Sequence, residues 1–379
     1  MKRSLISIVL AVCLHGSSVF ACTGFCVSQG DLVLVGNNED WKNPFTKVWN
    51  EPAGDGKYGR VYFGFDNFYP QGGMNEKGLV FDGFATGPHK VKDSLNKPTY
   101  GGNLMDKVMS ECATVDEALK LFDKYNLEFL ERAMFFVADE NGDSAIIEGD
   151  KIIRKNGKYQ IVTNFYQSEA KNGQIPCERY KIADAMLKEA DDISVDLCKR
   201  VLAATHNEGQ TPTVYSNVYD LKKRIVYLYH FHNFQNVMKI DLAEELKKDA
   251  RRMDLPALFP RMYIAETYMN RKANELKARK AEYTHKVGTE ILESYVGQYK
   301  LPADEGEPMV VIITRDGDKI FAGTKDQKKQ ELYPVSDSYF VFVTSDVDVK
   351  MTFVTDDNGK ATKLKAEAQG KTYTAEKIE

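Results

Sequence analysis

The sequence predicts a layered α+β protein in which stacked β-sheets are covered by helices, followed by a small antiparallel β domain. Three observations predict this fold class. Strand-like segments joined by tight turns fill much of residues 22–241. Helical segments interrupt these strands, as expected where helices cover the outer faces of sheets. Short alternating strands with turns return in residues 291–379, after a stretch rich in Ala, Glu, Lys and Arg.

The first expected elements are two short strands, residues 23–28 and 32–38, joined by a Gln29-Gly30-Asp31 turn. Side chains alternate along a strand, so Cys22, Gly24 and Cys26 are expected on one face. Strand pieces follow between residues 54 and 68. A Gly-rich turn at residues 73–78 then leads into a strand at residues 79–84.

The helical spacing of residues 102–125 is broken near Ala113-Thr114, which predicts two helices. Strands are expected at residues 133–138, 144–148 and 159–163, helices at 179–190 and 194–203, and a hairpin at 214–220 and 224–229. Residues 242–290 are predicted to be a helical connector around Pro256 and Pro260. The expected divisions are therefore residues 1–21, 22–241, 242–290 and 291–379.

The composition is that of a globular protein with a sizeable core, since 43% of the 379 residues are hydrophobic and 28% are charged. A net charge of -4 provides no basic field that would attract nucleic acid or anionic lipid. We therefore expect a small-molecule partner, no nucleic acid and, unless Cys22 is lipidated, no membrane. Assembly into a homo-oligomer is left open by the sequence.

Residues 1–21 are predicted to be a signal peptide, because an apolar run at residues 5–14 directly follows Lys2 and Arg3. Val19 and Ala21 provide the small residues expected before a cleavage site, so the mature chain should begin at Cys22. The expected location is the periplasm or the outside of the cell. The alternative is an outer-membrane lipoprotein, because residues 19–22 resemble a lipobox, although bulky Phe20 fits that motif poorly.

Removal of the signal would leave five cysteines, an odd number, and so at least one unpaired thiol. Cys22 is our candidate for that thiol. The remaining four could form up to two disulfides, whose pairing the sequence leaves open, or they could stay reduced: Cys26, Cys112, Cys177 and Cys198.

An N-terminal cysteine carries a thiol and a free α-amine, which supply a nucleophile and a general base on one residue. The amine has an ordinary pKa of about 7.7 to 8.0, so an appreciable fraction is neutral near pH 7. Polar residues 36–41 end the second expected strand, where a carboxylate could orient this amine; a polar turn is the simpler alternative. Asn164 closes another expected strand, where its amide could donate to an oxyanion; an Asx turn is the alternative.

Six motifs in order resemble the choloylglycine hydrolase family, which includes bile salt hydrolases and penicillin V acylases. They are Cys22-Thr23-Gly24, Gly36-Asn37-Asn38-Glu39-Asp40-Trp41, Gly73-Met74-Asn75-Glu76-Lys77-Gly78-Leu79, Val162-Thr163-Asn164, Glu178-Arg179-Tyr180 and Ser216-Asn217-Val218-Tyr219-Asp220-Leu221. The resemblance covers residues 22–241 and implies the four-layer αββα fold of the N-terminal nucleophile hydrolases. Residues 291–379 resemble a small lipocalin-like domain.

The resemblance also implies roles for individual residues. Cys22 would be the nucleophile and base, Asp40 the carboxylate that holds its amine, Asn164 an oxyanion donor, and Arg179 a further residue of the site. Two departures from bile salt hydrolases are Asn37, where they carry arginine, and Ala85, where they carry a second asparagine. Compensation would come from Asn38, Asn164 or backbone amides. These departures predict a linear acyl amide other than a conjugated bile salt as substrate.

The sequence therefore predicts an exported hydrolase of linear, non-peptide C–N amide bonds that works through a thioester acyl-enzyme. The alternatives are an acyltransferase that uses the same intermediate and a lipid-anchored, inactive binding protein. Aromatic residues 63–69 and Phe84 are candidates for the wall of an acyl pocket.

No cofactor and no metal are expected. His230 and His232 would share one face of a strand, but no nearby Cys or acidic residue completes a ligand set. His206 is interpreted as a loop histidine with satisfied hydrogen bonds. The acidic stretch at residues 139–143 is interpreted as a hairpin turn, because it lacks the spacing of a calcium loop.

Overall fold

The structure is a computed structural model, and it describes residues 22–378 apart from 92–95, 171–173, 325–328, 346–347 and 369–370. The expected signal peptide, residues 1–21, lies outside the described residues. Within the described ranges, no helix combines the length and the apolar character needed to cross a bilayer.

The first layer of strands is a six-stranded antiparallel sheet. Its order is β11 (Tyr159–Thr163), β1 (Thr23–Gln29), β2 (Leu32–Asp40), β12 (Thr213–Asp220), β13 (Ile225–His230) and β14 (Asn233–Asp241). The strand that begins just after Cys22 is thus flanked on both sides, by β11 and β2. The residue after β11 and the end of β2 consequently lie beside the start of β1.

The second layer of strands is an eight-stranded antiparallel sheet. Its order is β10 (Ile152–Arg154), β9 (Ser144–Ile147), β8 (Ala133–Ala138), β6 (Val80–Ala85), β5 (Pro70–Asn75), β4 (Arg60–Phe65), β3 (Thr46–Glu51) and β15 (Arg251–Asp254). The hairpin turn expected at residues 139–143 is confirmed, because the Asp139 carboxylate accepts hydrogen bonds from the backbone of Asn141 and Asp143 between β8 and β9.

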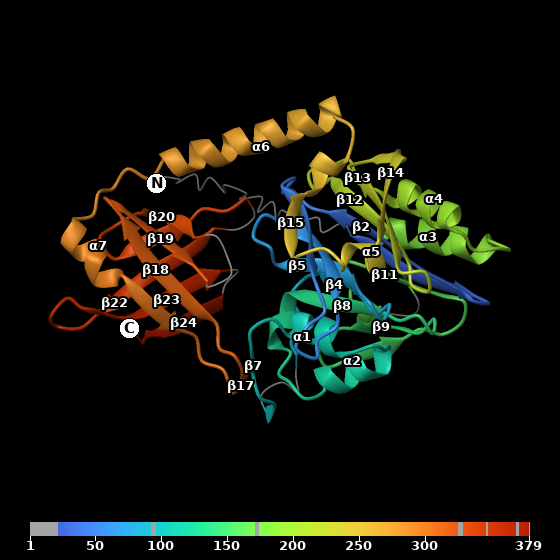
Figure 1. The fold of residues 1–379 in the computed structure, drawn as a ribbon, viewed down its shortest axis with the longest axis horizontal. Coiled ribbons are helices and arrows are strands. Elements are labelled where there is room, and N and C mark those ends of the chain that lie inside the picture. Colours follow the sequence, from blue (N-terminus) through green and yellow to red (C-terminus); the bar gives the residue numbers. More distant parts are fainter. Residues whose placement is uncertain are drawn as a thin grey trace, which may run out of the picture.

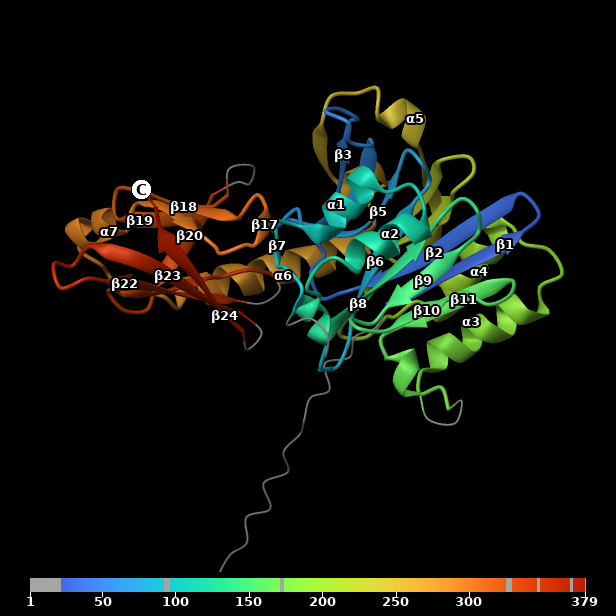
Figure 2. The same cartoon turned by 90° about the horizontal axis from the view of Figure 1, so that it is seen from below.

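The two sheets face each other across an apolar core that includes Val35, Phe63, Phe136 and Leu228. Helices α3 (Glu178–Glu189) and α4 (Val195–Thr205) cover the outer face of the first sheet, and α1 (Leu104–Glu111) and α2 (Val115–Phe122) cover the second. Figure 2 shows the layers in this order. The expected αββα sandwich is confirmed.

The break expected near Ala113-Thr114 separates α1 from α2. Thr114 is the N-cap of α2, and it forms a capping box with Glu117, whose side chain accepts the Thr114 backbone N–H. These reciprocal bonds satisfy amide groups that a helix start leaves without intrahelical partners. The break between the helices is therefore determined by local residues, the capping pair Thr114 and Glu117 at the start of α2.

Residues 242–290 differ from the expected helical connector. They contain α5 (Leu242–Glu245), β15, α6 (Tyr263–Ala281) and the start of α7 (Thr289–Tyr295). The strand β15 pairs with β3 and extends the second sheet. Its sequence, Arg251-Arg252-Met253-Asp254, has polar residues on both faces because it is an edge strand that is mostly exposed.

The C-terminal unit is a closed antiparallel barrel of β16 (Gly297–Lys300), β18 (Val310–Asp316), β19 (Lys319–Gly323), β20 (Gln330–Pro334), β21 (Tyr339–Phe342), β22 (Val349–Thr355), β23 (Ala361–Ala368) and β24 (Lys371–Lys377). It lies beside the sandwich, and α6 spans both units (Figure 1). A short parallel pair, β7 (Tyr100–Gly101) with β17 (Glu305–Gly306), joins them. Short 3-10 helices occur at Glu128–Arg132, Gln167–Glu169 and Leu255–Leu258.

Candidate active site

Cys22 lies immediately before β1 and is almost fully buried, with 5% of its surface exposed. Its thiol donates to the Asp40 carbonyl oxygen, with the sulfur 3.8 Å away. Burial raises the pKa of the Cys22 thiol well above its usual value, and the nearby charges of Glu39, Asp40 and Asp82 add to this effect. A thiol in this setting is protonated at neutral pH and needs a base to become a nucleophile.

Asp40 ends β2 and is completely buried. Its Oδ1 accepts a hydrogen bond from the Thr213 hydroxyl, whereas its Oδ2 has no hydrogen-bond partner among the described residues. Arg179 Nη1 lies 3.8 Å from that Oδ2. Burial raises the pKa of the Asp40 carboxyl, and the Thr213 hydrogen bond and the Arg179 charge oppose the rise.

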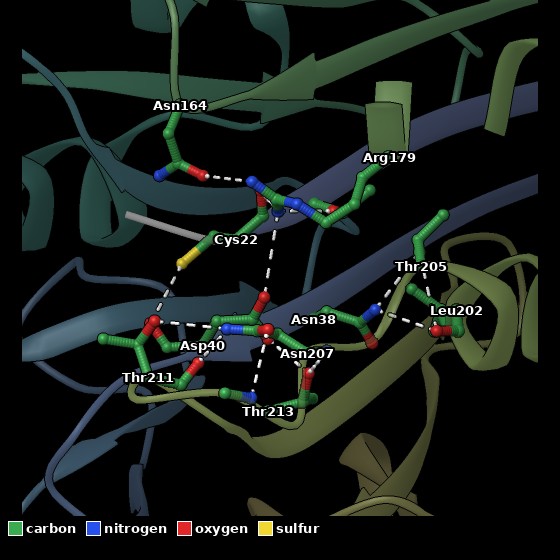
Figure 3. A network of polar contacts seen from close by, with 12 residues as sticks. Cys22, Asn38, Asp40, Asn164, Arg179, Leu202, Thr205, Asn207, Thr211 and Thr213 are labelled. Carbon is green, nitrogen blue, oxygen red and sulfur yellow. Dashed lines mark hydrogen bonds and ion pairs between the residues drawn. The ribbon is translucent and has the colours of Figure 1, made fainter. Parts of the chain in front are cut away.

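Arg179 lies in the first turn of α3 and connects the other residues (Figure 3). Its Nη1 donates to the Cys22 carbonyl oxygen at 2.7 Å and to the Thr23 hydroxyl at 2.9 Å. Its Nη2 donates to Asn164 Oδ1 at 3.3 Å. The planar guanidinium thus fixes the backbone of Cys22 relative to Asn164 and Asp40.

Asn164 follows β11, whose last residue, Thr163, pairs with Thr23. Its Nδ2 donates to the Ala85 carbonyl oxygen at 2.8 Å. An amide nitrogen carries two hydrogens, so a second donor remains for a ligand. Ala85 takes part in this arrangement only through its backbone, which orients Asn164.

The structure therefore brings Cys22, Asp40, Asn164 and Arg179 together. The side chains of Asn37 and Asn38, which are consecutive in β2, lie on opposite faces of that strand. The Asn38 amide donates to the Leu202 carbonyl at 2.9 Å and to Thr205 Oγ1 at 3.2 Å, which ties β2 to α4. We correct the expectation that Asn38 donates to substrate, because its amide is occupied on the helix-facing side. Asn37 is buried, and its side-chain nitrogen and oxygen have no partner among the described residues.

Sequence reasoning missed several residues beside Cys22. Besides Thr213, these are Glu39, Asp82 and Tyr215, all buried. The pKa of the Asp82 carboxyl is raised by burial and by Glu39, and burial likewise raises that of the Tyr215 hydroxyl. The period-2 alternation of β2 could have placed Glu39 on the face of Asn37. Asp82 gave no such signal, since its strand reads as an apolar run.

A cleft of about 810 Å³ borders this group of residues at Asn164. Its described lining comprises Gly87, Pro88, Asn164, Phe165, Tyr166, Glu169, Ala170, Gln174, Ile175, Pro176 and Lys181. Two residues of the expected aromatic wall, Phe63 and Phe84, are instead fully buried in the core between the sheets. They fill the sandwich because alternate residues of β4 and β6 point inward.

Two further expectations have a clear outcome. Cys22, Cys26, Cys112, Cys177 and Cys198 are all free thiols, so the described residues contain no disulfide. His230 and His232 do not share a strand face, because β13 ends at His230 and Phe231 turns the chain with a φ of 57°. His230 packs against Phe259, whereas His232 lies next to His206.

Comparison with solved structures identifies the fold of the sandwich. A variant of the conjugated bile acid hydrolase from Clostridium perfringens superposes with a TM-score of 0.50 at 18% identity, over 64% of this chain and 100% of that chain. The fold is that of an N-terminal nucleophile hydrolase. At this identity the likeness establishes the architecture alone.

Two further solved structures are similar at lower scores. A mutant of the same Clostridium perfringens enzyme has a TM-score of 0.48 at 19% identity, over 61% of this chain and 96% of that chain. The penicillin V acylase from Agrobacterium tumefaciens has a TM-score of 0.45 at 20% identity, over 64% of this chain and 94% of that chain.

The barrel has a separate match. A family model described as a domain of unknown function, DUF3471, matches residues 282–378, which include the whole barrel. No curated protein matches the chain. The expected resemblance of the barrel to a lipocalin-like domain is therefore not established by these comparisons.

Proposed function

We propose that this protein hydrolyses linear, non-peptide C–N amide bonds, with Cys22 as nucleophile once residues 1–21 have been removed. The observation that carries the proposal is the Arg179 guanidinium, which binds the Cys22 carbonyl and Asn164 and lies 3.8 Å from Asp40. Each of these side chains comes from a different part of the chain. Their convergence on the residue that would become the N-terminus supports a catalytic rather than a structural role.

The state of Asp40 supports a free α-amine at Cys22. A buried carboxylate oxygen without a hydrogen bond is costly, and Asp40 Oδ2 has none among the described residues. Cleavage before Cys22 would create an α-ammonium group close to this carboxylate, since Cys22 and Asp40 are already in contact. The ammonium would provide hydrogen bonds and opposite charge to Asp40, and Asp40 would orient the amine.

The proposed reaction follows from these positions. The neutral α-amine takes the thiol proton as sulfur attacks the amide carbon, which gives a tetrahedral intermediate. The intermediate collapses to a thioester when the C–N bond breaks, and the α-ammonium protonates the departing nitrogen. Water then attacks the thioester while the α-amine takes its proton. The acid leaves and the Cys22 thiol is restored.

The oxyanion of both intermediates needs donors that are already in place. The second amide hydrogen of Asn164 is one donor, since Arg179 and Ala85 fix the orientation of that side chain. The unpartnered amide of Asn37 is a second candidate. Arg179 and Asp40 act as positioning residues, because they hold the backbone and the amine of Cys22.

We propose a linear acyl amide as the substrate, with its acyl or amine part in the cleft beside Asn164. The fold is shared with a conjugated bile acid hydrolase, but Asn37 and Ala85 replace an arginine and an asparagine that bile salt hydrolases carry. Conjugated bile salts are therefore expected to be poorer substrates than aryl-acyl or fatty-acyl amides. A bile salt that exceeds every other amide tenfold in kcat/KM would contradict this.

Substitution of two cysteines tests the nucleophile. Cys22→Ser and Cys22→Ala should fold and lose turnover by several orders of magnitude, because the nucleophile and its coupled base act as a unit. Cys26→Ala is the matched control, since Cys26 is buried in the same inter-sheet core. If folded Cys26→Ala were equally inactive, Cys22 would not be the nucleophile.

A further inference from the structure

Three potential metal ligands meet at the edge of the first sheet, next to the candidate active site. His206 is the C-cap of α4, Glu208 follows it, and His232 lies in the turn between β13 and β14. One nitrogen or oxygen atom from each of the three lies within 4.8 Å of the other two. The sequence did not suggest this group because His232 lies more than twenty positions beyond His206 and Glu208 in the chain.

The hydrogen bonds of His206 determine which of its nitrogens is available. Nδ1 is 2.6 Å from the Ala203 carbonyl oxygen, which only accepts, so Nδ1 carries a hydrogen. In the neutral imidazole, Nε2 is then an acceptor and points to Glu208 Oε1 at 2.9 Å. Metal-binding histidines are commonly held in this way, with the other ring nitrogen donating to a carbonyl.

His232 adds a third potential ligand atom, a ring nitrogen without a hydrogen-bond partner. Its Nε2 is buried and makes no hydrogen bond to any described residue. A proton on His206 Nε2 would satisfy Glu208 but leave His232 Nε2 unpaired, whereas a cation between the three atoms satisfies all of them.

We propose that His206 Nε2, the Glu208 carboxylate and His232 Nε2 bind a divalent transition-metal cation, Zn²⁺ by preference. Two histidines and one glutamate form a known zinc ligand set, in which a fourth position stays open to water or a ligand. Zinc bonds of about 2.0–2.2 Å place neighbouring ligand atoms roughly 3.4 Å apart. The three ligand atoms already lie within 4.8 Å of one another, and the exposed Glu208 side chain has room to adjust.

The metal would fix the loop that supports Asp40. Asn207, between two of the ligands, donates its backbone N–H to Thr213 Oγ1 at 2.8 Å, and the Thr213 hydroxyl donates to Asp40. The Thr213 N–H donates in turn to the Asn207 carbonyl at 2.8 Å. A cation at His206 and Glu208 therefore restrains the segment that positions Thr213, without contacting Cys22 itself.

Zinc binding is best measured on mature protein carrying Cys22→Ala, because an N-terminal cysteine can chelate zinc by itself. This background also separates the metal site from catalysis by Cys22. Equilibrium dialysis against Zn²⁺ should give one ion per chain, and Zn²⁺ should raise the Tm. Co²⁺ should give visible absorption of tetrahedral intensity, without a thiolate charge-transfer band.

Additional substitutions identify the ligands. His232→Gln or Glu208→Gln should weaken Zn²⁺ binding by more than about 100-fold, because even loss of an outer contact to a ligand costs about 10- to 100-fold. The control is His285→Gln, because His285 also pairs with a carboxylate, Asp337 at 3.0 Å, but in the other unit of the chain. Unchanged zinc affinity in folded Glu208→Gln, or no zinc uptake by the parent protein, would overturn the proposal.

Discussion

At the scale of single residues, the arrangement around Cys22 depends on Arg179, whose guanidinium donates to the Cys22 carbonyl and lies 3.8 Å from the Asp40 carboxylate. Arg179→Ala should lower kcat about 100-fold or more with little change in KM, the effect typical of losing one preorganised electrostatic contact. Arg179→Lys should recover only a small part, since lysine lacks the planar fork. Steady-state kinetics on folded protein measures both.

Arg200→Ala is the control for Arg179, because Arg200 lies on α4 and pairs with Asp196 at the surface. It should retain the parent kcat. If kcat fell as much in Arg200→Ala as in Arg179→Ala, the effect would reflect helix stability rather than the position of Cys22.

The pH profile should report the α-amine of Cys22 rather than its thiol. The thiol pKa is raised well above its usual value, so the thiol stays protonated through neutral pH. Activity should rise with pH as the amine loses its proton, near or above its ordinary pKa of about 7.7 to 8.0, because the Asp40 carboxylate favours the ammonium form. Asp40→Asn removes that charge. The acid limb of the pH–activity profile of this variant should therefore move to lower pH, while its maximal rate falls.

The pH dependence of kcat/KM for the parent enzyme and Asp40→Asn measures this shift. Movement of the acid limb to higher pH in Asp40→Asn would contradict the assignment of the amine as the base. Asp196→Ala is a suitable control, because Asp196 is a surface residue on α4 and its replacement should leave the profile unchanged.

The sequence indicated a large part of the candidate site at this scale. Cys22, Asp40 and Asn164 stand next to or within expected strands, so local patterns could place them. Arg179 was transferred through resemblance alone, because nothing in its local sequence says that the helix start reaches Cys22. Asp82 and Tyr215 were missed because a polar residue within a buried strand acquires its neighbours only when the two sheets pack.

At the scale of elements, Asn75 joins the turn between β5 and β6 to the end of α1. Its buried amide donates to the carbonyls of Met109 at 2.9 Å and Cys112 at 2.8 Å, and its Oδ1 accepts the N–H groups of Lys77 and Leu79. The Gly-Met-Asn-Glu-Lys-Gly motif that contains Asn75 therefore stabilises the fold.

Asn75→Ala leaves several buried groups without partners, each worth about 1–3 kcal/mol, so the free energy of unfolding should fall by at least about 3 kcal/mol. Urea unfolding followed by circular dichroism measures the change. Asn126→Ala is a matched control, because Asn126 makes one comparable bond to the Glu128 N–H at the surface, and its loss should cost less than about 1 kcal/mol. Equal losses in the two variants would refute the role of Asn75.

Most elements could be predicted from the sequence, and the exceptions have physical causes. The break before α2 was visible because its capping residues are local. The strand β15 was not, because an exposed edge strand lacks the apolar alternation that identifies strands. The turn at His232 was also missed, because Phe231 adopts a positive φ there and no glycine stands at that position to indicate a turn.

At the scale of the whole molecule, the sandwich and the barrel have separate cores, and α6 contacts both. The Tyr268 hydroxyl of α6 donates to the Lys42 carbonyl at 3.0 Å, and Arg279 donates to the Thr344 carbonyl at 3.1 Å. Units with separate cores are expected to unfold as separate units.

Phe353→Ala tests this independence, because Phe353 stacks on Tyr295 in the barrel core, with ring centroids 4.1 Å apart. Loss of a buried phenylalanine typically costs about 3–5 kcal/mol. Calorimetry should show two unfolding transitions, and the substitution should lower the Tm of the barrel transition only. At temperatures below both transitions, amidase activity should be retained. A single transition that shifts as a whole would show that the two units unfold together.

The central claim is that the mature protein begins with an unmodified Cys22 whose thiol receives the acyl group. Intact-mass and peptide mass spectrometry of protein purified from the exporting cell, before and after brief exposure to an aryl-acyl amide, tests it most directly. We predict an N-terminal peptide that starts at Cys22, gains one acyl group on that residue, and gains none in Cys22→Ala. A diacylglyceryl cysteine, or Ala21 still attached to Cys22, would contradict the claim, because neither leaves the free α-amine that the mechanism requires.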